Sequence, residues 1–379
     1  MEIKNILLIR LRLLGDIVLT IPTIGLIKKN YPIANIYYMV EKEFEGIGKL
    51  LPDISELIVI PRKMGIQAML RLRKRIKAIG FDVLIDLHSG PKSSQIAFLS
   101  GIKKKIGYTV PFRSWIYDVK INRTQKKPYI HSVYNQIRLL DGIGIKVDSG
   151  NIPYYPEVTS GNFSLARPQS PGHYSLPAGH ATEKVTSRLS KYGTTENTQS
   201  KTKNEKRKTK NEKRKTKNEI VIHVGAGNEF RDWGTDNYIA LSRKLIDNGY
   251  SVSLIGHGDK ETQRGMEIEK EVIVNNYIAR LTIAESLYLI QCSDAYFGVD
   301  SGPLHLASLS NTPIIAIYGP NVPEISGPWR KEKITILQLD MDCRPCNQRV
   351  CIYKEKNDKI KCMKNIGVDK VYEAIIKHF

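Results

Sequence analysis

The chain has 379 residues, too many for one typical hydrophobic core, so we expect two domains. Its composition is ordinary for a globular protein, with 41% hydrophobic and 25% charged residues, and no run of about 18 apolar residues predicts a transmembrane helix. The formal net charge of +20 favours an anionic partner, but no helix-turn-helix, zinc-finger or RRM signature indicates nucleic acid.

Short apolar strands alternate with helical stretches through the first half of the chain. We expect strands over 6–9, 35–40, 56–60 and 83–87, and helices over 17–29, 43–51, 64–79 and 92–100. This alternation predicts a parallel, doubly wound sheet, which we assign to a first domain over 1–156. The N-terminus runs directly into the first strand without the small-residue cleavage site of a signal peptide, so we expect the protein in the cytoplasm.

A segment of different composition follows Pro156. Residues 157–218 lose hydrophobic periodicity, and 201–214 are two copies of KTKNEKR. A period of seven could indicate a coiled coil, but this repeat has no apolar a or d position. Residues 201–219 contain eight Lys and two Arg against three Glu, a net charge of +7. We predict a disordered, low-complexity basic linker, with a basic arm that contacts a membrane or another polyanion as the alternative.

Regular alternation resumes at Glu219 and defines a second domain over 219–379. We expect strands over 220–224, 251–255, 295–299 and 314–318, and helices over 238–247, 283–292, 301–309 and 368–376. Two similar α/β domains joined by a linker place a cleft between the carboxyl ends of their strands. Ligands bind in such crevices in open α/β sheets.

The first candidate site lies between the first strand and the first helix, at Gly15 and Asp16. Gly15 permits a tight turn. Asp16 could cap the helix, or it could present a carboxylate to the cleft as a general base. The pattern leaves both interpretations open.

The second candidate site follows the strand expected over 220–224. Gly225 and Gly227 would let the backbone approach the phosphates of a ligand. The full G-x-G-x-x-G fingerprint is absent because Phe230 occupies the position of the third glycine. Arg231 would add a permanent cation close to the phosphates, or it could be an exposed loop arginine.

The third candidate site opens the helix expected over 301–309. Backbone N–H groups near Gly302 and the Ser301 hydroxyl at a helix N-terminus would form an anion site. His305 follows one turn later. In the alternative interpretation, Asp300 and Ser301 only cap the helix and His305 packs against the sheet.

Four cysteines lie close together near the C-terminus: Cys343, Cys346, Cys351 and Cys362. Four thiolates could bind a structural zinc ion. The first pair has ligand spacing, but the others do not form a second C-x2-C. Reduced thiols or an occasional disulfide are the alternatives, and no base motif accompanies the cysteines to suggest a catalytic role.

Three segments in the same order resemble glycosyltransferase family nine, the lipopolysaccharide heptosyltransferases. They are ILLIRLRLLGDIVLTIPTI, the HVGAG…RDWG block with LIDNGYSVSLIGHGDKE, and LTIAESLYLIQCSDAYFGVDSGPLHLASLSNTPIIAIYGPNVPE. The resemblance covers both domains, and the last segment is the most specific. It implies an α/β fold of GT-B architecture, with two facing Rossmann-like doubly wound domains. The first would bind the acceptor and the second the donor.

The resemblance also implies an inverting, metal-independent transfer with no required cofactor. The expected donor is a nucleotide-diphosphate sugar, ADP-heptose, and the expected acceptor is a phosphorylated, lipid-linked saccharide of the lipopolysaccharide inner core. The basic surface suits an anionic membrane, so we expect peripheral association with the inner face of the inner membrane. A nucleotide-sugar epimerase, a dinucleotide-dependent oxidoreductase and a non-enzymatic basic polyanion-binding protein are the rival functions.

The resemblance assigns roles to most of the candidate residues. Asp16 matches the proposed base of the family, and Arg10 and Gly15 become candidates for the acceptor side. The donor motif D-[ST]-G-x-x-H is matched by Asp300, Ser301, Gly302 and His305. The sequence departs from the family pattern at Arg231, where a phosphate-binding lysine is usual, at Gly234, where a proline is usual, and in the 157–219 insert.

Overall fold

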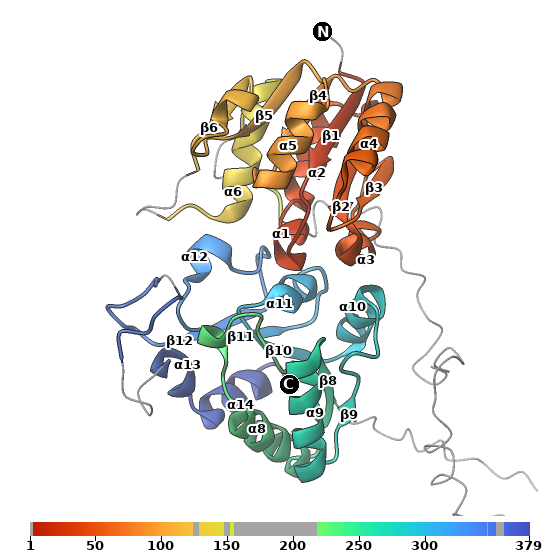
Figure 1. Cartoon of the computed structure of the whole chain (residues 1–379). Helices are drawn as coiled ribbons and strands as arrows, with labels where there is room; N and C mark the ends of the chain where they lie inside the picture. The colour runs from red at the N-terminus through yellow and green to blue at the C-terminus, as the bar shows by residue number, and fades with distance from the viewer. Residues whose placement is uncertain (1–2, 124–128, 148–151, 155–217, 347, 354–359) are drawn as a thin grey trace, which may run out of the picture. The chain divides into compact units, whose positions relative to one another are not determined.

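A computed structural model of the chain describes residues 3–123, 129–147, 152–154, 218–346, 348–353 and 360–379 (Figure 1). Two parallel sheets belong to one compact unit, which comprises Met1–Phe163 and Lys217–Phe379. The linker predicted over 157–218 lies outside the described residues except for Asn218. Among the described helices, none combines the length and the apolar character that crossing a membrane requires.

The first sheet has six parallel strands in the order β3-β2-β1-β4-β5-β6. The strands are β1 (Asn5–Ile9), β2 (Asn35–Glu41), β3 (Glu56–Ile60), β4 (Val83–Asp86), β5 (Lys104–Tyr108) and β6 (Val119–Ile121). The chain starts at the centre of the sheet and winds outward in both directions, which confirms the doubly wound prediction. Residues 6–9 of β1 are fully buried because helices cover both faces of a parallel sheet.

The helical elements of this half are α1 (Leu14–Val18), α2 (Ile21–Asn30), η1 (Lys42–Phe44), α3 (Glu45–Gly48), α4 (Ile66–Ile79), α5 (Pro91–Leu99), η2 (Ser114–Ile116), α6 (Ser132–Ile137) and η3 (Arg138–Ile143). The prediction of one helix over 17–29 was wrong, because the chain forms α1 and then α2. Pro22 lies in the first turn of α2. Proline has no N–H to continue an earlier helix but fits a helix start, so the break falls just before it.

The second sheet repeats the same topology in the order β12-β11-β10-β7-β8-β9. Its strands are β7 (Glu219–His223), β8 (Ser251–Ile255), β9 (Asn275–Asn276), β10 (Ala295–Val299), β11 (Ile314–Tyr318) and β12 (Ile334–Gln338). Its helical elements are η5 (Glu229–Arg231), α8 (Thr235–Asp247), α9 (Asp259–Glu271), α10 (Ile283–Cys292), α11 (Gly302–Ala307), α12 (Pro323–Ser326), α13 (Lys361–Lys364) and α14 (Val368–Ile376). The α/β class and the two Rossmann-like domains are therefore confirmed.

An aromatic cluster anchors the core of the second sheet. Trp233 is fully buried and meets Tyr238 and Phe297 edge-on, with ring centroids 5.1 and 5.2 Å away. Its indole N–H donates to the Ile366 carbonyl oxygen at 2.8 Å, which satisfies its one polar group inside the core. This packing fixes the backbone that follows Arg231 and so helps to position the residues described next.

Candidate functional site

Helices α1 and α11 contact each other where the carboxyl edges of the two sheets meet, and two glycines make the contact close. A Cβ atom on Gly15 would overlap Cδ2 of His305 and lie 3.1 Å from its Cγ. A Cβ atom on Gly302 would lie 3.0 Å from Cβ of Leu14. This contact brings the first and third candidate sites together, although they are nearly 300 residues apart in sequence.

Asp16 lies inside α1 and does not cap it. The N-cap residue is Leu13, and α1 has no side-chain capping bond, so the capping interpretation is wrong. The Asp16 carboxylate forms an ion pair with Nη2 of Arg10, and Nη1 of Arg10 donates to the Leu87 carbonyl oxygen at 2.6 Å. Arg10 is buried, whereas Asp16 keeps 29% of its side chain exposed. The carboxylate is thus oriented by a fixed cation and remains open to a ligand.

His88 was missed in the sequence analysis. It follows β4 in a turn held by Asp86, whose Oδ1 accepts a hydrogen bond from the His88 backbone N–H at 3.0 Å. Partial burial, together with the charges of Arg10 and Arg12, lowers the pKa of His88 to about 4, and Arg123 adds to the effect. His88 is therefore neutral beside a cationic cluster. The polar run DLHSGPKS after a buried strand was the available signal.

A cavity of about 480 Å³ borders the α1–α11 contact, since Leu14 and Gly302 both line it. Leu14 and Glu43 line it from the first half of the chain, and Gly227, Glu261, Ser301 and Gly302 from the second. Its volume lies within the range of about 300–1,000 Å³ that is typical of small-molecule sites. The cavity therefore joins the second and third candidate sites.

Glu261 is the second residue that the sequence analysis missed. Its Oε2 lies 3.4 Å from Nε2 of His223 and accepts a hydrogen bond from the His257 backbone N–H at 2.8 Å. Burial alone would raise its pKa, but these contacts outweigh burial and the pKa is lowered. A Cβ atom on Gly225 would overlap the Glu261 carboxylate, so Gly225 makes room for this side chain. Glu261 is an anion at the cavity wall.

Arg231, which is partly buried, forms an ion pair with the buried Asp300. Nη1 of Arg231 lies 3.2 Å from Oδ2 of Asp300, and Nε of Arg231 donates to Gln348 at 2.8 Å. Asn321 donates to the same Asp300 oxygen at 3.0 Å. Arg231 is only 25% exposed, so the exposed-loop interpretation is wrong. The pair fixes a guanidinium directly beside the residue that opens α11.

Ser301 is the N-cap residue of α11, but its side chain makes no capping bond. Its hydroxyl donates to the Val299 carbonyl oxygen at 3.0 Å and lies 3.3 Å from Nδ1 of His223. His305 is buried against Gly15, and burial lowers its pKa even though the Asp300 and Asp16 charges act in the opposite sense. The interpretation in which Asp300 and Ser301 only cap the helix does not describe these side chains.

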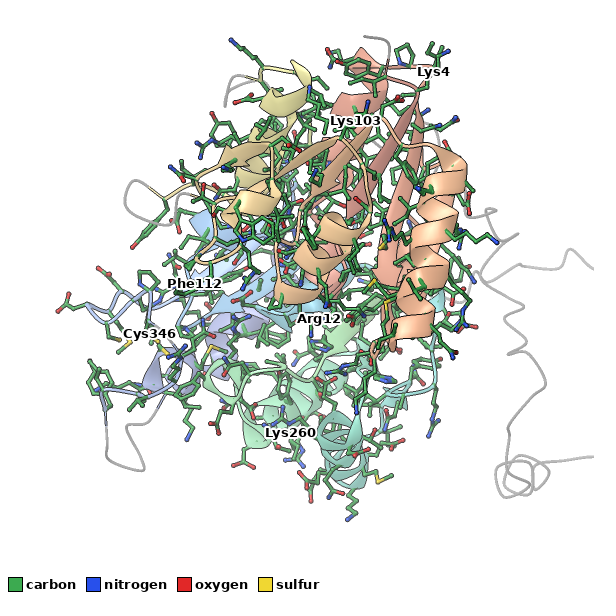
Figure 2. All side chains as sticks on the ribbon, turned by 45° about the horizontal axis from the view of Figure 1, so that its top comes forward. Lys4, Arg12, Lys103, Phe112, Lys260 and Cys346 are labelled. Carbon is green, nitrogen blue, oxygen red and sulfur yellow. The ribbon has the colours of Figure 1, made fainter. Side chains whose placement is uncertain are left out.

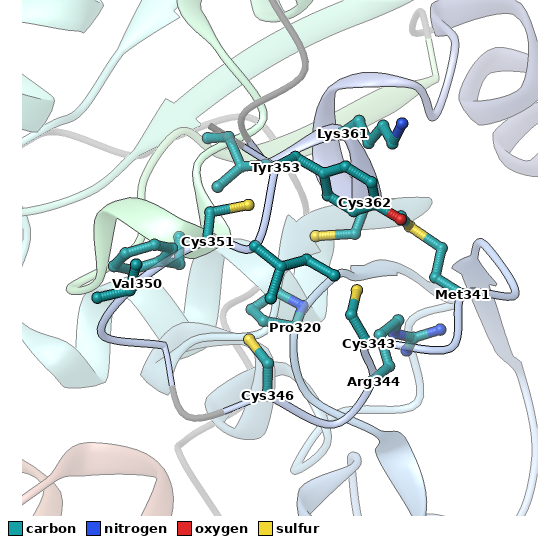
Figure 3. A pocket seen from close by; sticks show the side chains of 13 residues that line it. Pro320, Met341, Cys343, Arg344, Cys346, Val350, Cys351, Tyr353, Lys361 and Cys362 are labelled. Atoms are coloured by element: carbon teal, nitrogen blue, oxygen red, sulfur yellow. The ribbon is translucent and has the colours of Figure 1, made fainter. Parts of the chain in front are cut away.

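The four cysteines line one separate, small cavity of about 30 Å³, and Figure 3 shows Cys343, Cys346, Cys351 and Cys362 around it. All four are free thiols. Burial and the other three cysteines raise the pKa of Cys362 to about 11. Within the part of the chain that the structure describes, no three metal-ligating side chains are placed to hold an ion. The zinc site therefore stays a prediction.

Comparison with known proteins gives consistent matches. The family model described as "Glycosyltransferase family 9 (heptosyltransferase)" matches residues 178–357. Lipooligosaccharide heptosyltransferase 2 of Campylobacter jejuni is 29% identical over 146 residues, 37% of this chain and 45% of that relative. The chain thus aligns with less than half the length of this relative. Lipooligosaccharide heptosyltransferase 2 of Haemophilus influenzae is 24% identical over 347 residues, 88% of each chain.

Solved structures share the fold over the whole chain. A glycosyltransferase family 9 protein of Veillonella parvula has a TM-score of 0.71 at 19% identity, covering 100% of this chain and 98% of that one. The Escherichia coli ADP-heptose heptosyltransferase II has a TM-score of 0.68 at 20% identity, covering 99% and 98%. The expected GT-B architecture is confirmed.

Proposed function

The chain belongs to glycosyltransferase family 9, and from this premise we propose that it transfers a sugar from a nucleotide-diphosphate donor to an acceptor hydroxyl. The specific reaction that we propose moves heptose from ADP-heptose onto the lipopolysaccharide inner core. The names of the relatives support the choice of sugar. The observation that carries the proposal is the α1–α11 contact, because Leu14 and Gly302, which meet there, both line the 480 Å³ cavity, and Asp16 lies two residues beyond Leu14 in α1.

The cavity has the chemistry that a nucleotide-diphosphate sugar needs. The Glu261 carboxylate can accept hydrogen bonds from ribose hydroxyls, as an acidic residue does in other Rossmann-like sites. Gly227 and Gly302 leave backbone N–H groups open to approach by a diphosphate, and Ser301 lines the same cavity. Arg231, whose Nη1 lies 3.2 Å from Oδ2 of Asp300, adds a cation next to the residue that precedes Ser301.

Transfer requires a base for the acceptor hydroxyl and stabilisation of the leaving diphosphate. In our proposal, Asp16 takes the hydroxyl proton while the oxygen attacks the anomeric carbon from the face opposite the leaving group. The bond to the diphosphate breaks in the same displacement, which inverts the anomeric centre. Arg231 and the backbone N–H groups stabilise the negative charge that develops on the diphosphate. These groups supply the positive potential for which other transferases use a metal ion, so we propose a metal-independent transfer.

The first sheet suits an anionic acceptor. Arg10, Arg12 and Arg123 all act on His88, which places three permanent cations around the neutral imidazole. Arg12 has 41% of its side chain exposed, and its Nε lies 3.8 Å from Oε2 of the buried Glu41, a long contact that leaves the guanidinium accessible to a phosphate. We propose that this cationic cluster binds a phosphorylated, lipid-linked saccharide. Such an acceptor would bring the enzyme to the inner face of an anionic membrane.

The test is to measure transfer from ADP-heptose to an inner-core acceptor by wild-type protein and by Asp16→Asn. The substitution keeps size and hydrogen-bonding capacity but removes the base, so we expect a loss of about 10²-fold or more in turnover. Thermal stability should fall as well, because the buried Arg10 loses its ion pair, and circular dichroism checks that the variant stays folded. The anomeric configuration of the product, read by NMR, tests inversion. Turnover of Asp16→Asn like that of the wild type would reject Asp16 as the base. Isomerisation of the donor without an acceptor would favour the epimerase alternative.

A further inference from the structure

Three large aromatic side chains form an exposed cluster at the edge of the first sheet. Phe112 is 96% exposed, Trp115 67% and Phe98 54%. The Phe98 and Trp115 rings meet edge-on with centroids 5.2 Å apart, and the Trp115 indole N–H donates to the Phe112 carbonyl oxygen at 3.2 Å. We call these three residues the aromatic surface. Contiguous exposed aromatic residues of this kind mark interaction sites rather than ordinary surface.

The loop that carries the aromatic surface is firmly held. Tyr117 is buried, and its hydroxyl donates to Oδ2 of Asp86 at 2.6 Å. The Ser114 hydroxyl bridges the backbone N–H and carbonyl of Val110, at 2.8 and 2.6 Å. Phe112 itself has φ of +60°, a conformation that is unfavourable for a bulky residue. The loop therefore presents Phe112 to solvent in a fixed position.

The aromatic surface lies at the same end of the sheet as the proposed acceptor site. The loop follows the carboxyl end of β5, as Arg12 follows that of β1. Figure 2 shows Phe112 and Arg12 toward one end of the sheet, away from Lys4 and Lys103. Arg113 is the only charged residue between Tyr108 and Tyr117. The Arg123 guanidinium lies 4.2 Å from the centroid of the Tyr108 ring. Asp118 follows Tyr117, and its Oδ2 lies 3.2 Å from Nζ of Lys105, so this carboxylate is paired with a cation. Arg113 thus leaves a positive charge within the loop that carries Phe112 and Trp115.

We propose that the aromatic surface docks onto an anionic lipid bilayer, with the Phe112 and Trp115 rings in the headgroup region. Aromatic rings prefer this interface, and neighbouring arginines gain energy from anionic headgroups. The positive charge of Arg113 within the same loop matches anionic headgroups, which favours an anionic bilayer as the partner. This inference deepens the membrane association in the proposed function and rests on it. It does not depend on the transfer chemistry.

The tryptophans of the chain give the inference a direct readout. Trp233 is fully buried and Trp329 is stacked on Tyr154, whereas Trp115 is exposed. Vesicles containing phosphatidylglycerol should therefore shift the emission of Trp115 to shorter wavelength, and brominated lipids should quench it. Trp115→Phe should abolish the shift but keep most of the binding. A shift that persists in Trp115→Phe would contradict insertion of this residue.

The affinity of the surface is tested by co-sedimentation of the full chain with the same vesicles. The double variant Phe112→Ser and Trp115→Ser should lose at least about tenfold in vesicle affinity, because two apolar side chains no longer leave water on binding. Ile273→Ser removes an equally exposed apolar side chain, 92% exposed, from the other domain and should bind like the wild type. Transfer to a detergent-solubilised acceptor, measured in parallel, should be unchanged in both variants.

Each remaining outcome overturns a defined part of the inference. Unchanged vesicle binding by the double variant would reject the aromatic surface while leaving membrane association in place. Absence of binding by the wild-type chain would reject membrane association and leave the transfer reaction untouched. If the double variant instead converted a dimer to a monomer in gel filtration, the surface would be an interface between two copies of the chain.

Discussion

Replacing Gly15 by alanine should test whether the α1–α11 contact sets the spacing of the reactive groups. The added Cβ atom would overlap Cδ2 of His305, a buried side chain on the facing helix. Gly15 does not have positive φ, so the backbone can accept alanine, and the steric overlap is the only new term. Either the imidazole or one of the two helices must then move.

The size of the effect follows from the geometry. Ordinary contacts of a Cβ atom begin at 3.4 Å. Relief of the overlap with His305 therefore needs a displacement of about 1 Å, and overpacking of this kind costs about 1–3 kcal/mol of folding free energy. A misplacement of about 1 Å between reacting groups can reduce turnover by about 10²-fold. Because Asp16 is the next residue, we expect Gly15→Ala to lose about that factor in turnover.

Two further variants separate packing from chemistry. Gly367→Ala adds a Cβ atom with no neighbour within 4 Å, at the N-cap of α14, and should leave turnover unchanged. Its loss of stability in urea denaturation should stay within about 1 kcal/mol, the cost of alanine at an N-cap. Combining Gly15→Ala with His305→Ala removes the overlapping ring, so the two stability losses should not add. If the stability losses of Gly15→Ala and His305→Ala added fully, the view that this contact fixes the site would be refuted. Wild-type stability and turnover in Gly15→Ala would refute it as well.

Three other predictions concern charge and protonation. Glu261→Gln keeps the shape of the side chain but removes its negative charge, so the Kd for ADP measured by calorimetry should rise about tenfold; an unchanged Kd would remove Glu261 from the donor site. Arg231→Lys keeps the charge but cannot hold Asp300 and Gln348 together, and the KM for the donor should rise about tenfold with a smaller change in kcat. Burial lowers the pKa of His131 from 6.5 to about 4. The unfolded chain therefore takes up this proton at higher pH than the folded chain, and stability should fall as the pH drops from about 6.5 to about 4. His131 alone accounts for about 3 kcal/mol of this loss, and His88, whose pKa is also lowered to about 4, adds to it. Urea denaturation across this window measures the slope, and His131→Gln should reduce it; an equal slope in the variant would contradict the assignment.

The fold was largely predictable because buried parallel strands are short apolar runs. Strands such as β8 and β10 were predicted with their observed bounds. Helix α9 was missed because its sequence, DKETQRGMEIEKE, has few apolar residues, and only Ile268 among them is deeply buried. Strand β12 was missed because it lies at the sheet edge, where most of its side chains are only partly buried.

The site was less predictable, because its parts meet only through tertiary contacts. The patterns alone left the roles of Asp16 and Arg231 open, and no spacing could show that Arg231 pairs with Asp300. Glu261 went unnoticed together with its helix. His88 was overlooked because a histidine after a strand has no meaning until the arginines around it are known. The glycine turns, which are local, were thus predicted from the sequence, whereas the pairing of charges across elements was not.

The two glycines at the α1–α11 contact have a consequence for how the protein can tolerate motion. A rotation of one sheet against the other that kept this contact closed would turn about Gly15 and Gly302. Displacement grows with distance from such an axis, so the outer rims would travel furthest while Asp16 and the first residues of α11 would hardly separate. Substrates of different size would then fit between the sheets without a change in the distance between α1 and α11 at Gly15 and Gly302.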